Sequence, residues 1–265
     1  MPLKPAILCD LDGVVWLMHK PISGSVEAIR RIRESGHQVL FVTNNSHASA
    51  AEQATVLESI GIPALGHVVT ASQSAGALLR PGERVLTCGG PGVMQAIADA
   101  GAILAGRSDD PELPIDIEVD TVVVAFHRTF DFAGLTRLSA SIRNGARFIA
   151  TNDDATYPTP HGVIPGGGSI VAAVATASGV QPIVAGKPYA PMANLVRTVL
   201  GVSDLSDSWM VGDRVSTDGA FAQTLGCRFA HVQSGVSHTP DELQNVDFEG
   251  HDLAAFADFI DEKYR

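Results

Sequence analysis

Residues 7–14 are Ile7-Leu8-Cys9-Asp10-Leu11-Asp12-Gly13-Val14, a run of apolar residues that ends in two carboxylates and a glycine. A short apolar run bounded by turn residues is typical of a buried strand in a parallel sheet. The pattern predicts that Asp10 and Asp12 lie at the carboxyl end of a central strand, where open α/β sheets bind ligands. It also fits two acids that cap a turn, because Asp before Gly is common in turns.

Length and composition indicate a globular chain. Its 265 residues are 45% hydrophobic and 18% charged, which suits the cores of one large or two medium domains. The formal charge of −11 argues against a nucleic-acid polymer as partner, because such binding needs Lys and Arg to neutralise phosphates. Since no apolar stretch approaches the roughly 18 residues of a membrane span, we expect no membrane partner. The three widely spaced cysteines suit buried thiols, so we expect a cytoplasmic protein.

Predicted strands and helices alternate along the chain, as in a parallel sheet covered by helices. We expect strands at 7–9, 38–42, 85–88, 121–126, 147–150, 182–185, 209–211 and 228–232. We expect helices at 25–35, 51–60, 72–79, 93–100, 132–144, 169–178, 191–200 and 253–262, and one that ends before Gly226. A loop signal at Arg80-Pro81-Gly82 marks a boundary. We therefore predict a core of residues 1–82 and 182–265, interrupted by an inserted α/β domain at 83–181.

Four groups of polar residues follow the predicted core strands or the loops after them. They are Asp10 with Asp12, Thr43-Asn44-Asn45, Gly186-Lys187-Pro188, and Gly212-Asp213-Arg214 with Thr217-Asp218. Each group alone has a structural explanation, such as an N-cap for Thr43 or a turn for Asp213. Because the carboxyl ends of parallel strands meet at one edge of a sheet, we expect the four groups to meet in one crevice.

In this order the motifs resemble those of the haloacid dehalogenase superfamily, in particular the NagD-like phosphatases of subclass IIA. The resemblance covers nearly the whole chain and includes Thr151-Asn152-Asp153 and Pro165-Gly166-Gly167-Gly168-Ser169 in the insert. It implies an α/β protein with a Rossmann-like parallel-sheet core and an inserted C2-type α/β cap domain. It also implies a phosphoric monoester hydrolase that acts on a small phosphate ester with Mg²⁺ as cofactor. Substrates implied by the resemblance include phosphoglycolate, nucleoside monophosphates, sugar phosphates, pyridoxal phosphate and aryl phosphates.

The resemblance assigns chemistry to the first motif. Asp10 is the expected nucleophile, which forms an aspartyl-phosphate. Asp12 is the expected acid and base, which protonates the leaving alkoxide and then deprotonates the attacking water. Asp10, Asp213 and the backbone carbonyl of Asp12 are the expected Mg²⁺ ligands, since this ion prefers oxygen ligands.

The remaining motifs are expected to bind the phosphate. The hydroxyl of Thr43 and nearby amides, with Asn44 beside them, would hold phosphate oxygens, while Lys187 supplies a positive charge. Asp218 would orient Lys187 or the water molecules on the metal.

The insert contains the candidate specificity residues. Asn152 and Asp153 are the first candidates, with a helix N-cap as the alternative. His127 stands where many relatives have an acidic residue, which makes it a third candidate. His161 in the insert and His231 in the core are weaker candidates, for the rim between cap and core. A cap that closes over the crevice would exclude water and select the leaving group. Its exposed surface would also offer a site for a homodimer.

Two other functions compete with hydrolysis. A catalytically silent protein that binds phosphorylated metabolites would share the fold, although the complete set of acids and Lys187 argues against it. The turn Gly89-Gly90-Pro91-Gly92 after a predicted strand looks like the dinucleotide-binding loop of an oxidoreductase. It lacks the full G-x-G-x-x-G pattern and lies in the insert rather than beside the acids, so we favour a tight turn before a helix that starts with proline.

Overall fold

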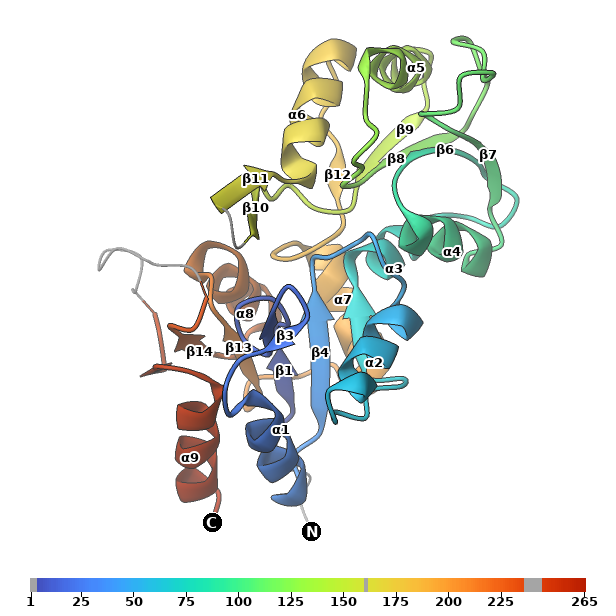
Figure 1. Ribbon diagram of the computed structural model, residues 1–265. Coiled ribbons are helices and arrows are strands. Elements are labelled where there is room, and N and C mark those ends of the chain that lie inside the picture. The colour runs from blue at the N-terminus through green and yellow to red at the C-terminus, as the bar shows by residue number, and fades with distance from the viewer. Residues whose placement is uncertain (1–3, 160–161, 236–244) are drawn as a thin grey trace. The chain divides into compact units, whose positions relative to one another are not determined.

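The computed structural model describes residues 4–159, 162–235 and 245–265. The chain forms two compact units, the first of residues 1–43, 51–69 and 187–265 and the second of residues 44–50 and 70–186. Each unit contains a parallel sheet flanked by helices (Figure 1). The expected α/β class is confirmed.

The first unit is built on a sheet with the strand order β15-β14-β13-β1-β4-β5. These strands are β1 (Ile7–Cys9), β4 (Val39–Thr43), β5 (Val68–Thr70), β13 (Trp209–Gly212), β14 (Arg228–Val232) and β15 (Phe248–Gly250). Strand β1 pairs in parallel with β4 and β13, so that Cys9 lies opposite Phe41 and Val211. All three residues of β1 are fully buried, which explains why its sequence is apolar without alternation.

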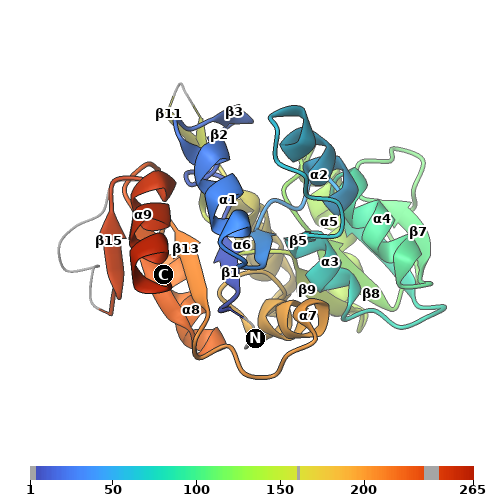
Figure 2. The same ribbon diagram turned by 90° about the horizontal axis from the view of Figure 1, so that it is seen from below.

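Helices cover both faces of this sheet (Figure 2). Helices α1 (Ser25–Glu34) and α9 (Leu253–Lys263) pack together on one face, where Arg31 forms ion pairs with Asp258 and Asp261. Helices α7 (Ala190–Leu200) and α8 (Ala220–Leu225) pack together on the other. The unit also contains α2 (Ala50–Ser59), a π-helix η1 (Val215–Gly219), and a hairpin of β2 (Trp16–Leu17) and β3 (Lys20–Pro21).

The second unit has a parallel sheet with the strand order β12-β9-β8-β6-β7. These strands are β6 (Arg84–Cys88), β7 (Ile103–Arg107), β8 (Thr121–Val124), β9 (Arg147–Ala150) and β12 (Ile183–Val184). Successive side chains of β8 point to opposite faces of the sheet, as the two-residue period of a strand requires. Val122 and Val124 pack with α5 (Phe132–Arg143) and α6 (Gly167–Ser178), whereas Val123 packs with α3 (Ala71–Gly76) and α4 (Pro91–Asp99).

Several elements had no prediction from the sequence. They are β5, β7, β15, the β2–β3 hairpin, and a hairpin of β10 (Thr156–Thr159) and β11 (Gly162–Pro165). Strand β7 shows why: it lies at the edge of its sheet, and Ile103 and Leu104 are exposed rather than buried. An edge strand therefore lacks the buried apolar run on which the sequence prediction depends.

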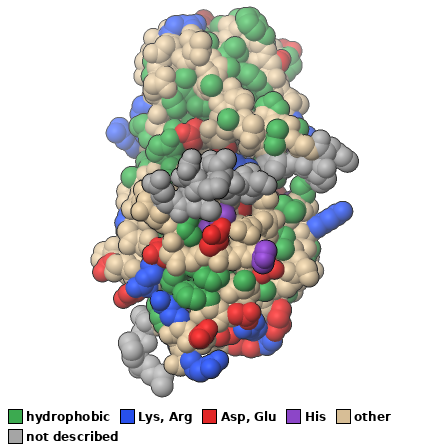
Figure 3. Space-filling model, turned by 90° about the vertical axis from the view of Figure 1, so that its left-hand side faces the viewer, with side chains coloured by type: hydrophobic (Ala, Val, Ile, Leu, Met, Phe, Trp, Pro, Cys, Tyr) green, Lys and Arg blue, Asp and Glu red, His purple; other side chains and the backbone are tan. Residues whose placement is uncertain are grey.

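The surface carries both signs of charge. On the face drawn in Figure 3, Lys and Arg side chains are scattered among Asp and Glu side chains. In the described part of the chain, none of the helices combines the length and the apolar character that crossing a bilayer requires.

A hydrogen-bonded cluster joins the segments that follow β7 and β8. Asp109 Oδ2 accepts from Arg107 at 2.8 Å and from Thr129 Oγ1 at 2.9 Å, and lies 2.9 Å from His127 Nε2. Burial alone would raise the pKa of Asp109, but the hydrogen bonds from His127 and Thr129 and the charge of Arg107 lower it to about 2. The carboxylate form of Asp109 therefore stabilises the fold of the second unit.

We expect Asp109→Asn to lower the free energy of unfolding by about 1–2 kcal/mol near pH 6. A carboxyl group whose pKa is lower in the folded state stabilises the fold at pH values above its unfolded-state pKa. This stabilisation is lost as the pH falls through the folded-state pKa. The difference between wild type and variant should therefore shrink as the pH falls from about 4 towards about 2. Urea unfolding of both proteins at a series of pH values measures this difference in the free energy of unfolding. Asp116→Asn, a change at an exposed aspartate of the same loop, is the control, and an effect of the same size there would contradict the assignment.

Candidate active site

Several of the predicted site residues lie at one edge of the first unit's sheet. Asp10 follows β1, Asp213 follows β13, and Thr43 ends β4. The Asp10 N–H donates to the carbonyl of Val211 at 2.9 Å, so the parallel pairing of β1 and β13 continues up to the acid. The three residues are buried. These strand ends lie at the same edge because the strands are parallel, as we expected from the sequence.

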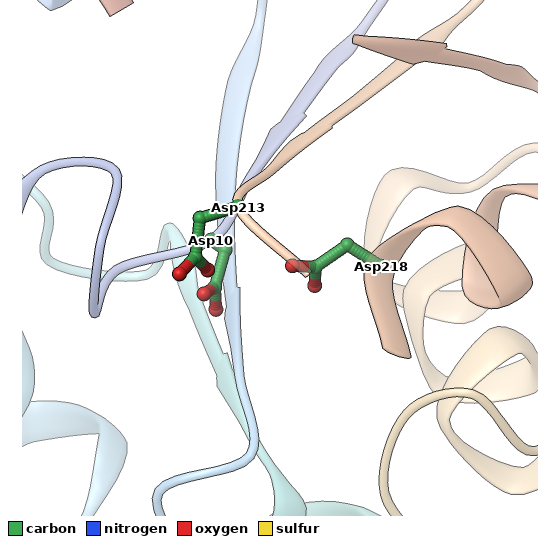
Figure 4. Close-up of side chains that lie close together, drawn as sticks. All are labelled: Asp10, Asp213 and Asp218. Atoms are coloured by element: carbon green, nitrogen blue, oxygen red, sulfur yellow. The ribbon is translucent and has the colours of Figure 1, made fainter. Parts of the chain in front are cut away.

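Three carboxylates converge at this edge. Asp10, Asp213 and Asp218 each have a carboxylate oxygen within 4.8 Å of the others, and all three residues are buried. In Figure 4, Asp10 and Asp213 lie side by side, and Asp218 points toward them from η1. Because like charges repel strongly in a buried site, such a group needs a cation.

Lys187 supplies one cation. Its Nζ donates to Asp10 Oδ1 and to Asp218 Oδ1, both at 2.7 Å, and its side chain is 2% exposed. Burial alone would lower the pKa of Lys187, but the charges of Asp10 and Asp218 raise it. The ammonium therefore stays charged and bridges the two carboxylates, whose repulsion it offsets.

The acids outnumber the cation, which suits a divalent metal ion. Burial raises the pKa of Asp10 well above its ordinary value, and the charges of Asp218 and Asp213 raise it further, although Lys187 opposes them. Carboxylate oxygens are the ligands that Mg²⁺ prefers, and its charge would offset the excess of negative charge. The donor set of this site thus fits Mg²⁺.

Two glycines allow the chain to approach Asp213. Gly13 has a φ of +93°, and a Cβ atom on it would lie 2.4 Å from Asp213 Oδ2. A Cβ atom on Gly235 would lie 2.0 Å from the same oxygen. Any side chain at either position would displace the carboxylate, so both glycines are part of the site's geometry. Gly13 belongs to the opening motif, whereas Gly235 had no signal in the sequence.

Asp12 lies two residues beyond Asp10, in a loop that folds back on itself. The Gly13 N–H donates to the carbonyl of Trp16 at 2.8 Å, and Asp12 and Trp16 form an isolated backbone bridge. Burial raises the pKa of Asp12, and His19, Trp16, Lys187 and Arg214 act in the opposite direction. A raised pKa helps a carboxyl group to keep a proton that it can donate.

The second unit holds Asn44, Asn152 and Asp153, and it satisfies the polar atoms of Asn152 internally. Asn152 Nδ2 donates to the carbonyl of Asn44 at 2.9 Å, and Asn152 Oδ1 accepts from the Asp154 N–H at 3.2 Å. Asn44 Nδ2 in turn donates to Asp154 Oδ2 at 3.0 Å. Asn152 therefore holds a turn and the segment after Thr43, while the Asp153 carbonyl lies against Gly168.

The histidines of the candidate set lie in different surroundings. His127 is largely buried in the Asp109 cluster, and the sequence offered no sign of this partner because β7 was not predicted. His231 is 3% exposed at the end of β14, with its Nδ1 3.7 Å from Glu249 Oε1. His161 lies outside the described residues.

The glycine-rich turn before α4 is packed by the protein itself. Pro91 begins α4, as expected if these glycines form a tight turn before a helix that starts with proline. The Gly92 N–H donates to the carbonyl of His47 at 2.8 Å, and a Cβ atom on Gly92 would lie 2.5 Å from the Ala48 carbonyl oxygen. The close approach of residues 44–50 explains the glycine without a dinucleotide.

Comparison with known proteins identifies the family. Residues 7–103 match the model for a haloacid dehalogenase-like hydrolase, and residues 184–258 match a related model of HAD-like hydrolases. The chain is 37% identical to D-glycerol 3-phosphate phosphatase of Mycobacterium tuberculosis, over 93% of this chain and 69% of that protein. It is 34% identical to acid sugar phosphatase of Staphylococcus saprophyticus, over 90% of each chain.

A solved structure agrees with this assignment. The crystal structure of glycerol phosphate phosphatase Rv1692 from Mycobacterium tuberculosis in complex with magnesium superposes with a TM-score of 0.80 and 33% identity, over 95% of this chain and 75% of that one. The chain therefore belongs to the haloacid dehalogenase-like hydrolases, as a phosphatase of subclass IIA.

Proposed function

We propose that this protein is a Mg²⁺-dependent phosphatase that hydrolyses a small phosphomonoester through an aspartyl-phosphate on Asp10. The observation that carries the proposal is the buried ammonium of Lys187, 2.7 Å from both Asp10 and Asp218. A carboxylate can attack an anionic phosphate only where positive charge offsets the repulsion. Lys187 supports such an attack because it touches the proposed nucleophile directly.

The two acids of the first motif have different roles in this mechanism. A carboxylate oxygen of Asp10 attacks phosphorus, and the bond from phosphorus to the ester oxygen breaks. Asp12 gives its proton to that oxygen, and then takes a proton from the water that attacks the aspartyl-phosphate and releases inorganic phosphate. The raised pKa of Asp12 supports the first of these proton transfers.

The other residues bind and orient the phosphate. Thr43, Asn44 and Lys187 would hold its oxygens, and Asp218 would hold Lys187 in place through their 2.7 Å contact. Asp10, Asp213 and the carbonyl of Asp12 would hold Mg²⁺. When bound, the ion would neutralise charge on the phosphoryl oxygens.

The relatives support the substrate class. Two of them are named D-glycerol 3-phosphate phosphatase and acid sugar phosphatase, so we propose a small polyol or sugar phosphate. Residues 83–181 would form the cap over the site, with Asn152, Asp153 and His127 as specificity residues. Cytoplasmic location, a homodimer and the absence of nucleic-acid partners stay predictions from composition and resemblance.

Replacement of the nucleophile provides the first test of this mechanism. We expect Asp10→Asn to lower the rate of phosphate release from p-nitrophenyl phosphate by at least about 1000-fold, because an amide cannot form the intermediate. Release of p-nitrophenolate with Mg²⁺ present measures this. Asp207→Asn, at an exposed aspartate paired with Arg228, should keep full activity. Activity of Asp10→Asn near that of the wild type would exclude Asp10 as nucleophile, and a folded wild type that hydrolyses no phosphate ester would favour a silent binding protein.

Removal of the buried cation should affect both activity and stability. We expect Lys187→Met to abolish activity and to lower the free energy of unfolding by about 3–5 kcal/mol, because it leaves buried carboxylates without a partner. The double variant Lys187→Met/Asp218→Asn should regain part of the stability but no activity. Urea unfolding and phosphate release measure the two effects, and Lys20→Met, at an exposed lysine, is the control. Unchanged stability in Lys187→Met would show that the ion pairs contribute little.

Metal binding can be tested without turnover. After treatment with a chelator, the wild type should gain thermal stability on addition of Mg²⁺, by about 2.7 kcal/mol when the ion is at 100 times its Kd. Asp213→Asn should lose most of this gain, whereas Asp207→Asn should keep it. Differential scanning calorimetry measures the shift. An equal gain in Asp213→Asn would place the ion elsewhere.

A further inference from the structure

The turn after β14 contacts the loop of the first motif. Ser234 Oγ donates to the carbonyl of Gly13 at 2.7 Å. The next residue, Gly235, lies against Asp213, since a Cβ atom on it would lie 2.0 Å from Asp213 Oδ2. Two consecutive residues thus contact the two segments that carry Asp12 and Asp213, although Ser234 has no role in the proposed mechanism.

The first unit's sheet holds this turn in place. The Gln233 N–H donates to the carbonyl of Gly250 at 3.0 Å, which continues the pairing of β14 with β15 beyond Val232. Gln233 Nε2 also donates to Glu249 Oε1 at 2.8 Å. The hydroxyl of Ser234 therefore extends from a fixed backbone, from which it can hold Gly13 in position.

Gly13 is a residue that needs such support. Its φ of +93° is a conformation that glycine enters and leaves easily, because it has no Cβ atom. The Gly13 N–H donates to the Trp16 carbonyl at 2.8 Å, and the Gly13 carbonyl accepts from Ser234. The first bond restrains the peptide before Gly13 and the second restrains the peptide after it. Together they hold the backbone of Gly13 in one conformation.

The restraint extends to Asp12 through the peptide that joins it to Gly13. This peptide is trans and planar, so the Asp12 carbonyl and the Gly13 N–H point in opposite directions. A rotation at Gly13 would therefore turn the Asp12 carbonyl, which is one of the proposed Mg²⁺ ligands. Loss of a group that orients a metal ligand typically weakens metal binding by about 10–100-fold.

We propose that Ser234 is a positioning residue for the metal site: its bond to Gly13 fixes the carbonyl of Asp12, while Gly235 leaves room for the carboxylate of Asp213. The proposal rests on the proposed function, which assigns Mg²⁺ to these oxygens. The Ser234 hydroxyl acts through Gly13 and carries no charge. Its removal therefore weakens binding of the ion but leaves every ligand of the site in the chain.

Titration of Mg²⁺ into the full chain after treatment with a chelator tests this role without turnover. We expect Ser234→Ala to raise the Kd for Mg²⁺ about tenfold, as measured by isothermal titration calorimetry. Ser234→Thr keeps a hydroxyl donor and should bind Mg²⁺ within about twofold of the wild type. Gly235→Ala should raise the Kd further, because its methyl group would displace the carboxylate of Asp213. An unchanged Kd in Ser234→Ala would overturn the proposal.

Ser35→Ala is the matched control. Ser35 Oγ donates to Asp261 Oδ1 at 2.6 Å, a contact that joins the end of α1 to α9 within the same unit. Loss of this bond should lower the free energy of unfolding but leave the Kd for Mg²⁺ unchanged. If Ser35→Ala raised the Kd as much as Ser234→Ala, a general loss of stability would explain both variants and the positioning role would be wrong.

The dependence of kcat on Mg²⁺ gives a second readout. Because Ser234 acts through the metal site, kcat of Ser234→Ala should fall at low Mg²⁺ and return to within about twofold of the wild type at saturating Mg²⁺. A kcat that stays low at saturating Mg²⁺ would contradict this role. A wild type that binds Mg²⁺ but hydrolyses no phosphate ester would contradict the proposed function alone, since the Kd of Ser234→Ala would still decide the role of Ser234.

Discussion

The buried ammonium of Lys187 is the interaction on which the arrangement of the site depends. Carboxylate oxygens of Asp10, Asp213 and Asp218 lie within 4.8 Å of one another in a buried site, so a cation is needed to offset their repulsion when all three are ionised. Lys187 contacts two of the three acids, so it offsets only part of their charge. The remaining negative charge attracts a divalent ion, and the two cations together can accept an anionic ester. The same charges thus account for the assembly of the site and for its chemistry.

The parallel sheet provides the second constraint. Residues 10, 43 and 213 are far apart in sequence, but each ends or follows a strand whose neighbours run in the same direction. A parallel sheet therefore gathers such residues without any long-range contact of their side chains. Asp218 reaches the group by another route, from the π-helix after β13. This helix brings its carboxylate toward Asp10 and Asp213 (Figure 4).

The sequence predicted those features that depend on local pattern. Strand β1 was predictable because a strand buried on both faces is apolar throughout. The proximity of Asp10 and Asp213 was predictable because neighbouring parallel strands end at the same edge of a sheet. Strand β7 was not, since its side chains are exposed at a sheet edge, and with it the partnership of Asp109 and His127 was missed. Gly235 was missed for a different reason. Its importance lies in its close approach to Asp213, a contact across the fold that a sequence pattern does not show.

The two units use their polar groups in different ways. In the first unit, Asp10, Asp218 and Lys187 are bonded to one another in a charged cluster that suits an anionic ligand. In the second, Asn152 binds backbone atoms with both ends of its amide, and Asp109 collects donors from three neighbours. An amide satisfied in this way acts on a substrate chiefly by holding the loop around it in position. Under the proposed function, attack on phosphorus would depend on charge in the first unit, and selection of the ester would depend on the shape of the loops in the second. Such a separation would allow relatives to keep one chemistry while their substrates differ.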